Sequence, residues 1–483
     1  MQWWLLRQKL HTSWLTALLC AAIIVGVVCA QWMTSFSSIS WVCLGVVAAG
    51  LGLRVRSLSV IPLIVVAGMV IGLWRGSIEQ QQLMVYETIY GSTMTVTGKV
   101  VDDADVGMGG ALVMRVGDIS MDGRYLTGKL WISSSTEYDV KRGDIVTVSG
   151  TVSTGFGNFA GAMFRADVTK VQRPQPGDVA RQVRDWFADA VRKAIPDPEA
   201  SLGIGYLVGQ KRALPPDLSE ALMIVGLTHV VVASGYNLTI LVRLARRLFV
   251  KVSKYLALLS ASTMVLAFMA VTGASPSMSR AGLVAGLSLA AWYYGRSFHP
   301  LVLLPFAAAI TLLVDPGFAW GDLGWQLSFA AFAGVMILAP LLQRYFYGDK
   351  KPGIVRQLLG ETISAYIVTL PILIYAFGAY SNVAIIANLL VLPFVPLAML
   401  LTFIAGIGAL VMPQFAGIIG APASWLLEYM IVVANYLADL PWAQGELQIE
   451  VPTTAAMYGI IIGMCVYLWR VTRYNLRDSN LVE

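Results

Sequence analysis

The sequence predicts a polytopic α-helical membrane protein of about 12 spans, with a small extracytoplasmic all-β domain of the OB type inserted after the first helices. Of the 483 residues, 57% are hydrophobic and only 13% are charged, whereas soluble domains carry about 25% charged residues. Apolar runs of about 20 residues, long enough to cross a bilayer, recur along the chain. The stretch between Ser77 and Asp178 instead holds 12 acidic and 9 basic residues, as a water-facing domain does. Soluble, disordered, collagen-like and disulfide-stapled classes are thereby excluded.

Residues 1–76 are predicted to form an N-terminal membrane anchor of three helices. The apolar runs are Trp14–Met33, Ile39–Leu53 and Leu58–Trp74. A short sequence around Cys29 resembles a signal-peptidase site. The two apolar runs that follow favour a retained anchor, although the sequence leaves open whether the Cys20/Cys29 region is cleaved. Arg54 and Arg56 place the turn between the second and third runs in the cytoplasm, because basic loops stay inside.

Residues 77–173 are predicted to form the extracytoplasmic β domain. Five short segments show partial alternation of apolar and polar residues, and clusters of Gly, Asp and Asn separate them. The segments are Thr93–Val101, Ala111–Ile119, Tyr125–Ser133, Asp144–Ser153 and Met163–Val171. Five strands in so short a stretch indicate a small Greek-key barrel of the OB type.

Residues 174–225 are predicted to hold amphipathic helices at the membrane surface. Two prolines mark a linker at the start of this stretch. In Val179–Ile195, apolar residues recur at every fourth position and the arginines lie elsewhere, which is typical of a helix that lies flat on a membrane. The helical stretches Ala200–Gly209 and Asp217–Val225 are too short to span a bilayer.

Residues 226–470 are predicted to form the main helical membrane domain, and 471–483 a cytoplasmic tail. The predicted spans are Thr228–Leu248, Leu256–Thr272, Gly282–Tyr294, Leu301–Val314, Leu323–Leu342, Ile363–Phe377, Val383–Leu410, Phe415–Leu437 and Thr453–Trp469. Lysines and arginines cluster after the first, third, fifth and last of these spans, whereas acidic residues fall in alternate loops. By the positive-inside rule, both termini and every basic cluster lie in the cytoplasm.

The residue patterns of the common metal and nucleotide enzymes are missing from the sequence. The chain has four cysteines, all within apolar runs, and three histidines, and it lacks a Walker loop, HExxH and GxSxG. Cysteines in such runs usually serve as small buried hydrophobes. We therefore expect no catalytic residues, no metal and no cofactor.

The sharpest interruption of an apolar run lies between Thr228 and Asn237. His229, Ser234, Gly235 and Asn237 put polar or small residues inside one predicted span. Irregular backbone at membrane depth is tolerated only where it faces protein or a water-filled cavity. Two interpretations stand: these residues line an aqueous path, or they form a kink for helix packing in which His229 caps a helix end.

A second interruption, Thr272–Ala281, has the composition of a capped helix entrance. Arg280 falls in the first turn of that helix, where a cation opposes the helix dipole. It therefore needs a compensating partner or an anionic ligand, unless it is simply an arginine that snorkels. Arg243, at the inner end of the preceding span, is a further candidate contact for an anion.

Four more polar residues lie inside apolar runs. Gln326 and Ser328, early in one span, are candidates for a polar path or for hydrogen bonds between helices. Asn388 lies in a span that two prolines break, as in the discontinuous helices of transporters. Glu428 lies near the middle of its span and needs a partner or a proton, which makes it a candidate for proton coupling.

Together and in order, these residues resemble the ComEC family of competence proteins, and the resemblance covers nearly the whole chain. Four motifs carry it: Gly226–Gly235, Thr272–Ala281, Asp315–Phe329 and Thr369–Pro393. In that family, an N-terminal anchor, an extracytoplasmic OB-like domain and a helical competence domain are thought to carry single-stranded DNA across the bacterial cytoplasmic membrane during natural transformation. The resemblance implies the same fold, location and channel function here.

The resemblance also implies partners: single-stranded DNA, membrane lipid, a separate DNA receptor, cytosolic helicase or strand-binding proteins and, as a further candidate, a second copy of this chain. Tyr236-Asn237 stands where the family usually has Leu-His, so a role tied to that histidine is not carried over. Many members continue into a metallo-β-lactamase-like domain that these residues lack, so we expect any nuclease to be a separate protein. The alternative function is a small-solute or ion transporter that uses the broken helix and Glu428.

Overall fold

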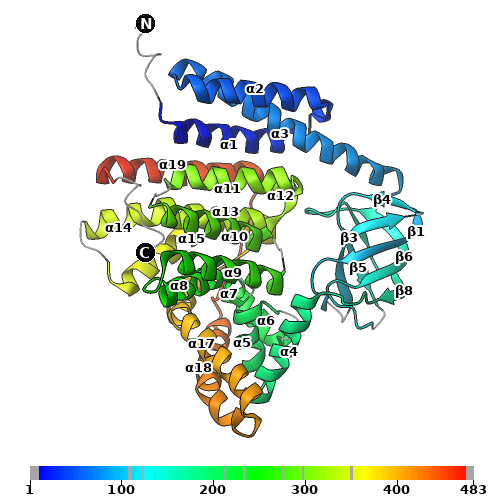
Figure 1. Ribbon diagram of the computed structural model, residues 1–483, viewed down its shortest axis with the longest axis vertical. Helices are drawn as coiled ribbons and strands as arrows, with labels where there is room; N and C mark the ends of the chain where they lie inside the picture. The colour runs from blue at the N-terminus through cyan, green and yellow to red at the C-terminus, as the bar shows by residue number, and fades with distance from the viewer. Residues whose placement is uncertain are drawn as a thin grey trace. The chain divides into compact units, whose positions relative to one another are not determined.

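The computed structural model describes residues 10–474, except 107–110, 122, 136–137, 211–213, 232–234, 274–275, 296–298 and 349–351. It is mostly helical and contains one small β-barrel (Figure 1). The chain divides into two units: the first comprises Met1–Asp178 with Leu301–Gln326, and the second comprises Val179–Pro300 with Leu327–Glu483. The short helical segment 301–326 thus belongs with the N-terminal helices and the barrel.

Eight helical stretches in the described part of the chain are long and apolar enough to cross a membrane. They are Thr12–Cys29, Leu58–Thr88, Lys254–Thr272, Leu323–Tyr347, Val355–Phe377, Ala384–Val411, Pro413–Ala438 and Val451–Thr472. Two shorter apolar helices, Ile39–Val55 and Pro300–Val314, add further candidates. A polytopic helical protein with a small β domain is therefore confirmed, while the figure of about 12 spans stays a prediction.

The helices of the first unit cover the three N-terminal apolar runs and the predicted span Leu301–Val314, and the third helix continues past its predicted end at Trp74 to Leu83. They are α1 (Thr12–Cys29), α2 (Ile39–Val55), α3 (Ile61–Leu83), α11 (Pro300–Val314) and α12 (Gly317–Gly321). Glycines let α1 and α3 approach closely: a Cβ at Gly72 would lie 2.2 Å from the carbonyl oxygen of Ile23. Such close backbone packing is how helices associate in lipid, where burial of apolar surface gives no net gain.

The β domain is a closed barrel of five strands. It comprises β1 (Thr93–Val100), β3 (Leu112–Met121), β5 (Leu130–Ser134), β6 (Ile145–Thr154), β7 (Gly161–Met163) and β8 (Asp167–Gln172). The strand order is β1-β3-β5-β7-β6-β8, and an additional pairing of β1 with β6 closes the barrel, so that β7 and β8 share the fifth place. Two short strands, β2 (Asp105–Val106) and β4 (Arg124–Leu126), pair with β3.

Two of the predicted strands are split in the structure. The predicted strand Tyr125–Ser133 becomes β4 and β5, and Gly128 between them has φ +104°. The predicted strand Met163–Val171 becomes β7 and β8, and Arg165 between them has φ +52°. A residue with positive φ leaves the extended conformation, and an alternating pattern does not reveal it.

The described part of the second unit is helical apart from one two-stranded ladder, β9 (Ala379–Ser381) with β10 (Gln444–Glu446). Its helices are α4 (Val179–Ala194), α5 (Glu199–Val208), α6 (Pro216–Ile224), α7 (Thr228–Val231), α8 (Gly235–Phe249), α9 (Lys254–Thr272), α10 (Pro276–Tyr293), α14 (Ala339–Tyr347), α15 (Ile354–Phe377), α16 (Ala384–Val391), α17 (Val395–Val411), α18 (Ala416–Ala438) and α19 (Val451–Thr472). The boundary between the units falls within α13 (Leu323–Ala333), and a π-helical turn at Gly334–Leu338 follows in the second unit.

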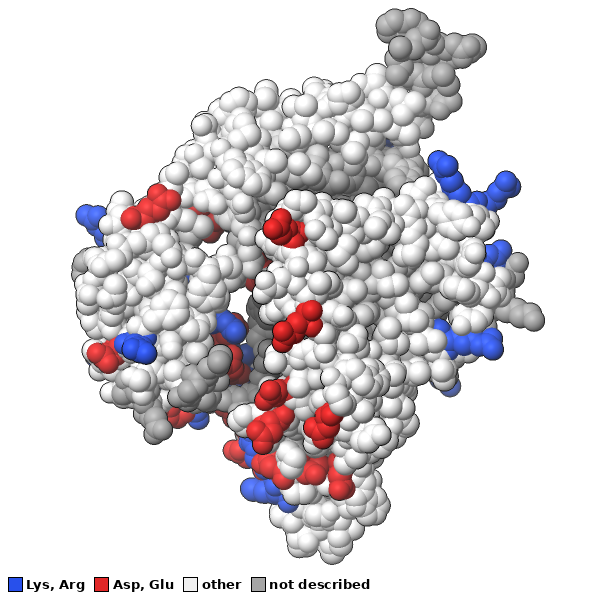
Figure 2. All heavy atoms as spheres, turned by 180° about the vertical axis from the view of Figure 1, so that it is seen from behind, with Lys and Arg blue, Asp and Glu red and all other residues white. Residues whose placement is uncertain are grey.

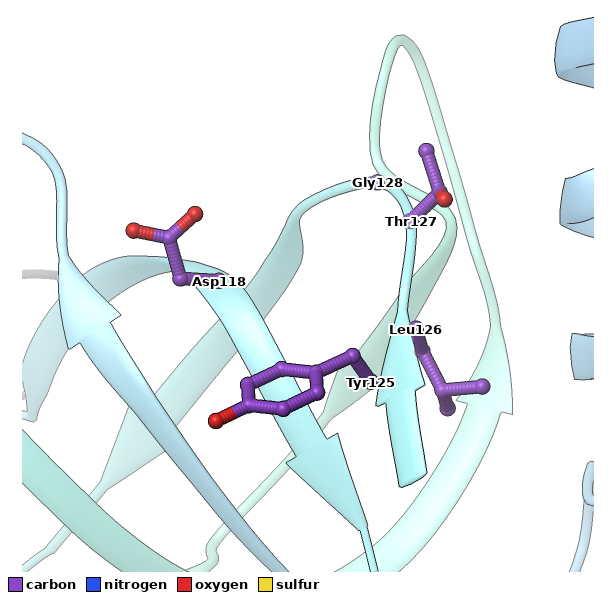
Figure 3. A pocket seen from close by; sticks show the side chains of 5 residues that line it. All are labelled: Asp118, Tyr125, Leu126, Thr127 and Gly128. Carbon is purple, nitrogen blue, oxygen red and sulfur yellow. The ribbon is translucent and has the colours of Figure 1, made fainter. Parts of the chain in front are cut away.

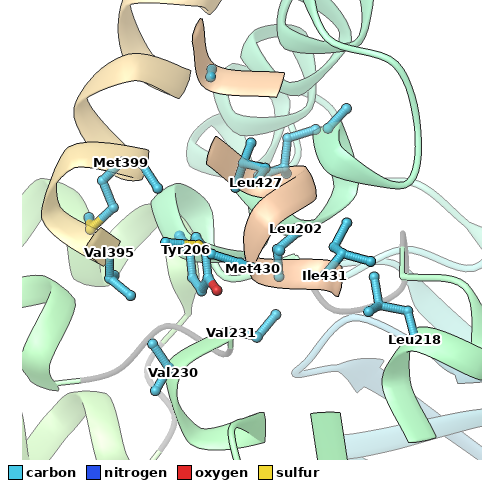
Figure 4. Packing of buried hydrophobic residues seen from close by; sticks show 14 of the residues in the cluster. Leu202, Tyr206, Leu218, Val230, Val231, Val395, Met399, Leu427, Met430 and Ile431 are labelled. Carbon is cyan, nitrogen blue, oxygen red and sulfur yellow. The ribbon is translucent and has the colours of Figure 1, made fainter. Parts of the chain in front are cut away.

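The largest core of the second unit forms where α5, α7, α17 and α18 meet (Figure 4). Leu202 and Tyr206 of α5 pack in one cluster with Met399 of α17 and with Leu427 and Met430 of α18. Tyr206 is among the largest side chains that the fold buries fully. This core fixes the elements that flank the interruption at Thr228–Asn237.

Helix α4 forms as predicted, but its burial pattern differs from that of a helix lying flat on a membrane. Arg181 and Arg184 are buried, whereas Val183 and Trp186 are exposed. Asp185 lies 3.2 Å from Nη1 of Arg181 and 3.0 Å from Nη2 of Arg184, so a carboxylate offsets part of the buried charge. The arginines therefore face the unit's interior, and the location of α4 at the membrane surface stays a prediction.

Candidate functional site

The predicted span at Thr228–Leu248 is two helices, α7 and α8. Among the described residues, α7 ends at Val231 and α8 begins at Gly235. Ser234 lies outside the described residues. Gly226, which precedes α7, has φ +73° and lies against α16: a Cβ there would be 3.0 Å from Cβ of Ala384. The first and fourth motifs therefore meet at this turn.

Asn237 is fully buried in the first turn of α8. Its side-chain amide donates hydrogen bonds to the carbonyl oxygens of Tyr206 (3.0 Å) and Val230 (3.3 Å). It thereby ties α8 to α5 and to α7 across the interruption. His229 is exposed, and its Nδ1 lies 2.9 Å from the carbonyl oxygen of Gly226, as a local cap would.

Gly235 lies next to Arg280 of α10, although 45 residues separate them in the sequence. A Cβ at Gly235 would lie 3.1 Å from Cβ of Ala281 and 3.3 Å from Nη2 of Arg280. The absence of a side chain at Gly235 leaves room for the guanidinium. The first two motifs, which the sequence presents separately, thus form one site.

Arg280 lies over two aromatic rings of α13. Its Cζ is 5.8 Å from the ring centroid of Phe329 and 5.5 Å from that of Phe332. The two phenylalanines are three residues apart, so they share a face of α13. Phe329 ends the third motif, but sequence reasoning gave neither ring a role, although their spacing on an apolar helix was a usable signal.

The charge of Arg280 has no carboxylate beside it in the described part of the chain. Its side chain is half-buried, and its buried Nε lacks a hydrogen-bond partner among the described residues. Contact with ring faces attracts a cation, but it does not neutralise the charge. A cation held this way inside a helical membrane domain is costly unless an anion or water reaches it.

The third motif contacts the barrel within the first unit. Nζ of Lys129 lies 3.5 Å from Oδ2 of Asp315, and Nδ2 of Asn158 donates a 2.7 Å hydrogen bond to Oδ2 of Asp322. Asp322 also accepts a 2.7 Å hydrogen bond from the backbone N–H of Trp325, so it caps α13. Burial raises the pKa of Asp322, while the hydrogen bond from Trp325 acts in the opposite direction.

The remaining predicted residues lie in different surroundings. Gln326 and Ser328 are half-buried on α13, and Arg243 is exposed on α8. Asn388 is buried on α16, where its Oδ1 lacks a hydrogen-bond partner among the described residues. Glu428, predicted to need a partner, is exposed on α18.

Helix α16 is separated from α17 by a 3₁₀ turn at Leu392–Phe394, so the span that contains Asn388 is broken as its prolines predict. The hydroxyl of Tyr236 on α8 lies 3.4 Å from the carbonyl oxygen of Leu392 in this turn. The interruption at α7–α8 therefore contacts the broken helix.

Arg75 on α3 is a structural residue that sequence reasoning missed. Its Nε and Nη2 donate hydrogen bonds of 2.9 Å each to the carbonyl oxygens of Leu313 and Val314 at the end of α11. Its Nη1 pairs with Glu79 at 3.1 Å. A guanidinium at the C-terminus of a helix satisfies the last carbonyl groups and complements the helix dipole.

A depression on the barrel is lined by Asp118, Tyr125, Leu126, Thr127 and Gly128 (Figure 3). Its lining supplies one carboxylate and one phenol, but no cationic side chain. Among the residues that the structure describes, no group of three or more His, Cys, Asp or Glu side chains is arranged to hold a metal ion. The unneutralised guanidinium of Arg280 is therefore the clearest candidate binding group in the helical domain, and the ligand that it would bind is an anion.

Comparison with known proteins places the motifs in one family. The family model "Competence protein" matches residues 206–472, which include α7, α8, α10 and the helices that hold Phe329 and Asn388. ComE operon protein 3 of Bacillus subtilis (strain 168) is 26% identical over 220 residues, which are 44% of this chain and 27% of that protein. The chain thus matches about a quarter of the length of this relative. No solved structure matches the chain significantly.

The family match covers more than half of the chain and includes Gly235, Arg280 and the two rings that hold its guanidinium. The chain therefore belongs to the ComEC family of competence proteins.

Proposed function

We propose that this protein carries single-stranded DNA across the cytoplasmic membrane of a bacterium during natural transformation, and that Arg280 lies on the path of the DNA. Membership of the competence family supports a role in DNA uptake. The observation that carries the residue-level proposal is the position of Arg280 over Phe329 and Phe332, beside Gly235, with no acidic neighbour among the described residues.

A single strand of DNA presents one negative charge and one flat base per nucleotide. Phosphate is attracted by a guanidinium whose charge is not already neutralised, and bases stack on aromatic rings. Arg280 and its two phenylalanines offer both kinds of contact within one site. Because an aromatic ring attracts the guanidinium without neutralising its charge, the N–H groups of Arg280 can donate hydrogen bonds to a passing phosphate.

We further propose the orientation that the loop charges imply, with both termini in the cytoplasm and the barrel outside. In the view of Figure 2, lysines and arginines gather mainly along one edge of the helical part, whereas the aspartates and glutamates lie away from that edge. This separation supports the positive-inside assignment.

The proposed role is that of a conduit without a catalytic step of its own. A separate DNA receptor would deliver the strand, a separate nuclease would supply it if duplex DNA is the source, and a cytosolic helicase or strand-binding protein would draw it inward. Association with a second copy of the chain belongs to the same proposal.

The proposal is tested by deletion and by charge variants of Arg280. Deletion of the gene should abolish uptake of labelled DNA into the cytoplasm, and unchanged uptake would reject the proposal. Arg280→Glu should lower transformation by about a hundredfold, because reversing a charge at a half-buried site changes an interaction by about 2–3 kcal/mol. Arg280→Lys keeps the charge and should retain most of the activity.

The matched control is Arg356→Glu. Arg356 also lies over an aromatic ring, that of Tyr347 at 5.1 Å, but it is exposed and outside the four motifs. It should transform as wild type. Equal losses for the Glu and Lys variants of Arg280, at normal protein levels in the membrane, would assign Arg280 to packing instead of to DNA.

The broken helix supports a second candidate function, transport of a small solute or ion. The 3₁₀ turn at Leu392–Phe394 and the buried Asn388 form the kind of interrupted helix that transporters use. Proton coupling at Glu428 is tested by Glu428→Gln: if a pH-coupled flux exists and the variant keeps it, the coupling is not at Glu428.

A further inference from the structure

Four aromatic rings gather on the outside of the barrel. Trp131 of β5 lies 5.5 Å from Phe156 and 5.3 Å from Phe164, measured between ring centroids, and Phe156 lies 5.5 Å from Phe159. Phe156 and Phe159 belong to the connection between β6 and β7, and Phe164 follows β7. We call these four residues the aromatic patch.

The aromatic patch is not part of the barrel core. Leu130 and Ile132, which flank Trp131 on β5, are fully buried, so Trp131 points to the opposite side of the sheet. Phe156 is 46% exposed and Phe164 is 54% exposed. Exposed rings that touch one another form a contiguous apolar surface, which usually marks a binding site on a small domain.

The position of the aromatic patch is the usual ligand side of a barrel of this type. Oligonucleotides and oligosaccharides bind such barrels on the second and third strands and on the loop between the fourth and fifth strands. Here β3 and β5 are the second and third strands, and the β6–β7 connection is that loop. Trp131 and two of the phenylalanines lie on these elements.

The charges around the aromatic patch are few. Arg115 pairs with Trp131 across β3 and β5, but Asp102 and Asp105 lie 3.4 Å and 3.7 Å from its guanidinium. Arg165, directly after Phe164, is exposed and forms no ion pair with the described residues. Arg165 is therefore an unneutralised cation that adjoins the aromatic patch in the sequence.

We propose that the aromatic patch binds the bases of single-stranded DNA by stacking, with Arg165 contacting one phosphate. This inference rests on the proposed function of the chain. A duplex hides its base faces and presents phosphates, which a surface with a single unneutralised cation holds poorly. A single strand exposes base faces, and aromatic rings accept any base because each has a π-face.

The same loop that carries Phe156 and Phe159 also contacts the helical part of the first unit. Gly157 lies against Gly321 at the end of α12, and Asn158 is bonded to Asp322. A strand on the aromatic patch would thus contact the same loop that Asp322, the cap of α13, holds in place.

The experiment measures binding of a fluorescein-labelled oligothymidylate to the full-length protein in phosphatidylcholine nanodiscs. Phe156→Ala and Phe164→Ala should each weaken binding by about tenfold, which is within the range for loss of one base stack. Because both rings are exposed, their removal should leave the barrel folded. The matched control is Tyr125→Ala: Tyr125 is 85% exposed on β4, outside the aromatic patch. It should bind as wild type.

Salt dependence gives a second readout. Binding that relies on stacking and one phosphate contact should change with salt by a log–log slope of about −0.7, and Arg165→Gln should flatten that slope. Wild-type affinity in both phenylalanine variants overturns the inference. A steep slope that Arg165→Gln leaves unchanged also overturns it, because the DNA is then held by other cations.

A lipid surface is the rival occupant of the aromatic patch. A polarity-sensitive dye on Phe164→Cys, with the four native cysteines replaced by serine, should report water until the oligonucleotide is added. A dye that reports a lipid environment without DNA overturns the inference. Failure of the proposed function is distinguishable, because the deletion strain would then take up DNA as the wild type does. Failure of this inference alone would leave DNA uptake dependent on the gene but unaffected by Phe156→Ala and Phe164→Ala.

Discussion

The side-chain amide of Asn158, on the barrel, donates a 2.7 Å hydrogen bond to the carboxylate of Asp322, 164 residues later in the chain. Asp322 also caps α13 by accepting a hydrogen bond from Trp325. One carboxylate therefore serves both the β6–β7 loop and the start of a predicted span. Asp322, in the third motif, thus stabilises the structure of the first unit, whereas the sequence suggested for this motif a polar path or hydrogen bonds between helices.

Replacement of Asn158 by Ala should loosen the β6–β7 loop without unfolding the barrel. A hydrogen bond to a charged group contributes about 1.5–3 kcal/mol, so exchange of backbone amides at 155–160 should accelerate by more than tenfold. Hydrogen exchange followed by mass spectrometry measures this. Asn382→Ala, which removes a hydrogen bond to the carbonyl oxygen of Trp442 in the second unit, is the control and should leave those amides unchanged. Unaltered exchange in the Asn158 variant would contradict the role assigned to this bond.

Arg75→Ala should destabilise the contact between α3 and α11. The substitution leaves the carbonyl groups of Leu313 and Val314 without their donor, at a cost of about 1–3 kcal/mol. Arg75→Lys should recover only part of the loss, because an ammonium lacks the planar fork that reaches two carbonyl groups at once. Thermal unfolding in detergent measures the change.

The control for Arg75 is Arg54→Ala, since Arg54 is exposed at the end of α2. It should unfold at the wild-type temperature. Full recovery of stability in Arg75→Lys would mean that a positive charge near the end of α11 is sufficient, and that simultaneous hydrogen bonds to both carbonyl groups are not needed.

The long helices and the barrel could be predicted from the sequence because their signals are local. Apolar runs predicted the helices α1, α3 and α19. The alternation of apolar and polar residues predicted β1 and β6, and both ends of these two strands agree with the structure within one residue. The splits at Gly128 and Arg165 could not be predicted, since they depend on the φ angle of single residues.

The partners of the candidate site could be predicted only in part. The position of Arg280 in the first turn of a helix indicated a cation that needs a partner. That the partner surface is formed by Phe329 and Phe332 depends on tertiary packing of α10 against α13. The inward orientation of Arg181 and Arg184 likewise depends on packing, because the apolar spacing of α4 suggested the reverse.

Arg173→Ala should destabilise the barrel. Asp144 is almost completely buried, and Arg173 reaches both of its oxygens, with Nε 3.0 Å from Oδ1 and Nη2 2.9 Å from Oδ2. Removing one partner of such a pair leaves a buried charge and costs about 3 kcal/mol. Hydrogen exchange of β6 and β8 measures the loss. Lys170→Ala, which removes an exposed cation from β8, should leave exchange unchanged, and equal protection in both variants would contradict the role of the pair.

Gly235 should tolerate no branched side chain if the position of Arg280 matters for DNA. A Cβ at Gly235 would meet Ala281 at 3.1 Å and Nη2 of Arg280 at 3.3 Å, which is tighter than ordinary contact. In Gly235→Ala the flexible end of Arg280 gives way by a few tenths of an ångström, so we expect transformation to fall by only about threefold. In Gly235→Val the added methyl groups displace the guanidinium from its place over the two rings, and we expect a loss close to that of Arg280→Glu.

The control is Gly286→Ala on α10, where a Cβ would meet nothing within 4 Å. Alanine and valine both have a higher helix propensity than glycine, so neither substitution should weaken the helix itself. Loss of transformation at undiminished thermal stability would therefore indicate a blocked site and not a damaged fold. Wild-type uptake by Gly235→Val at normal protein levels would show that DNA does not pass the Arg280 guanidinium. The interruption at α7–α8 would then serve only the packing that Asn237 makes with Tyr206 and Val230.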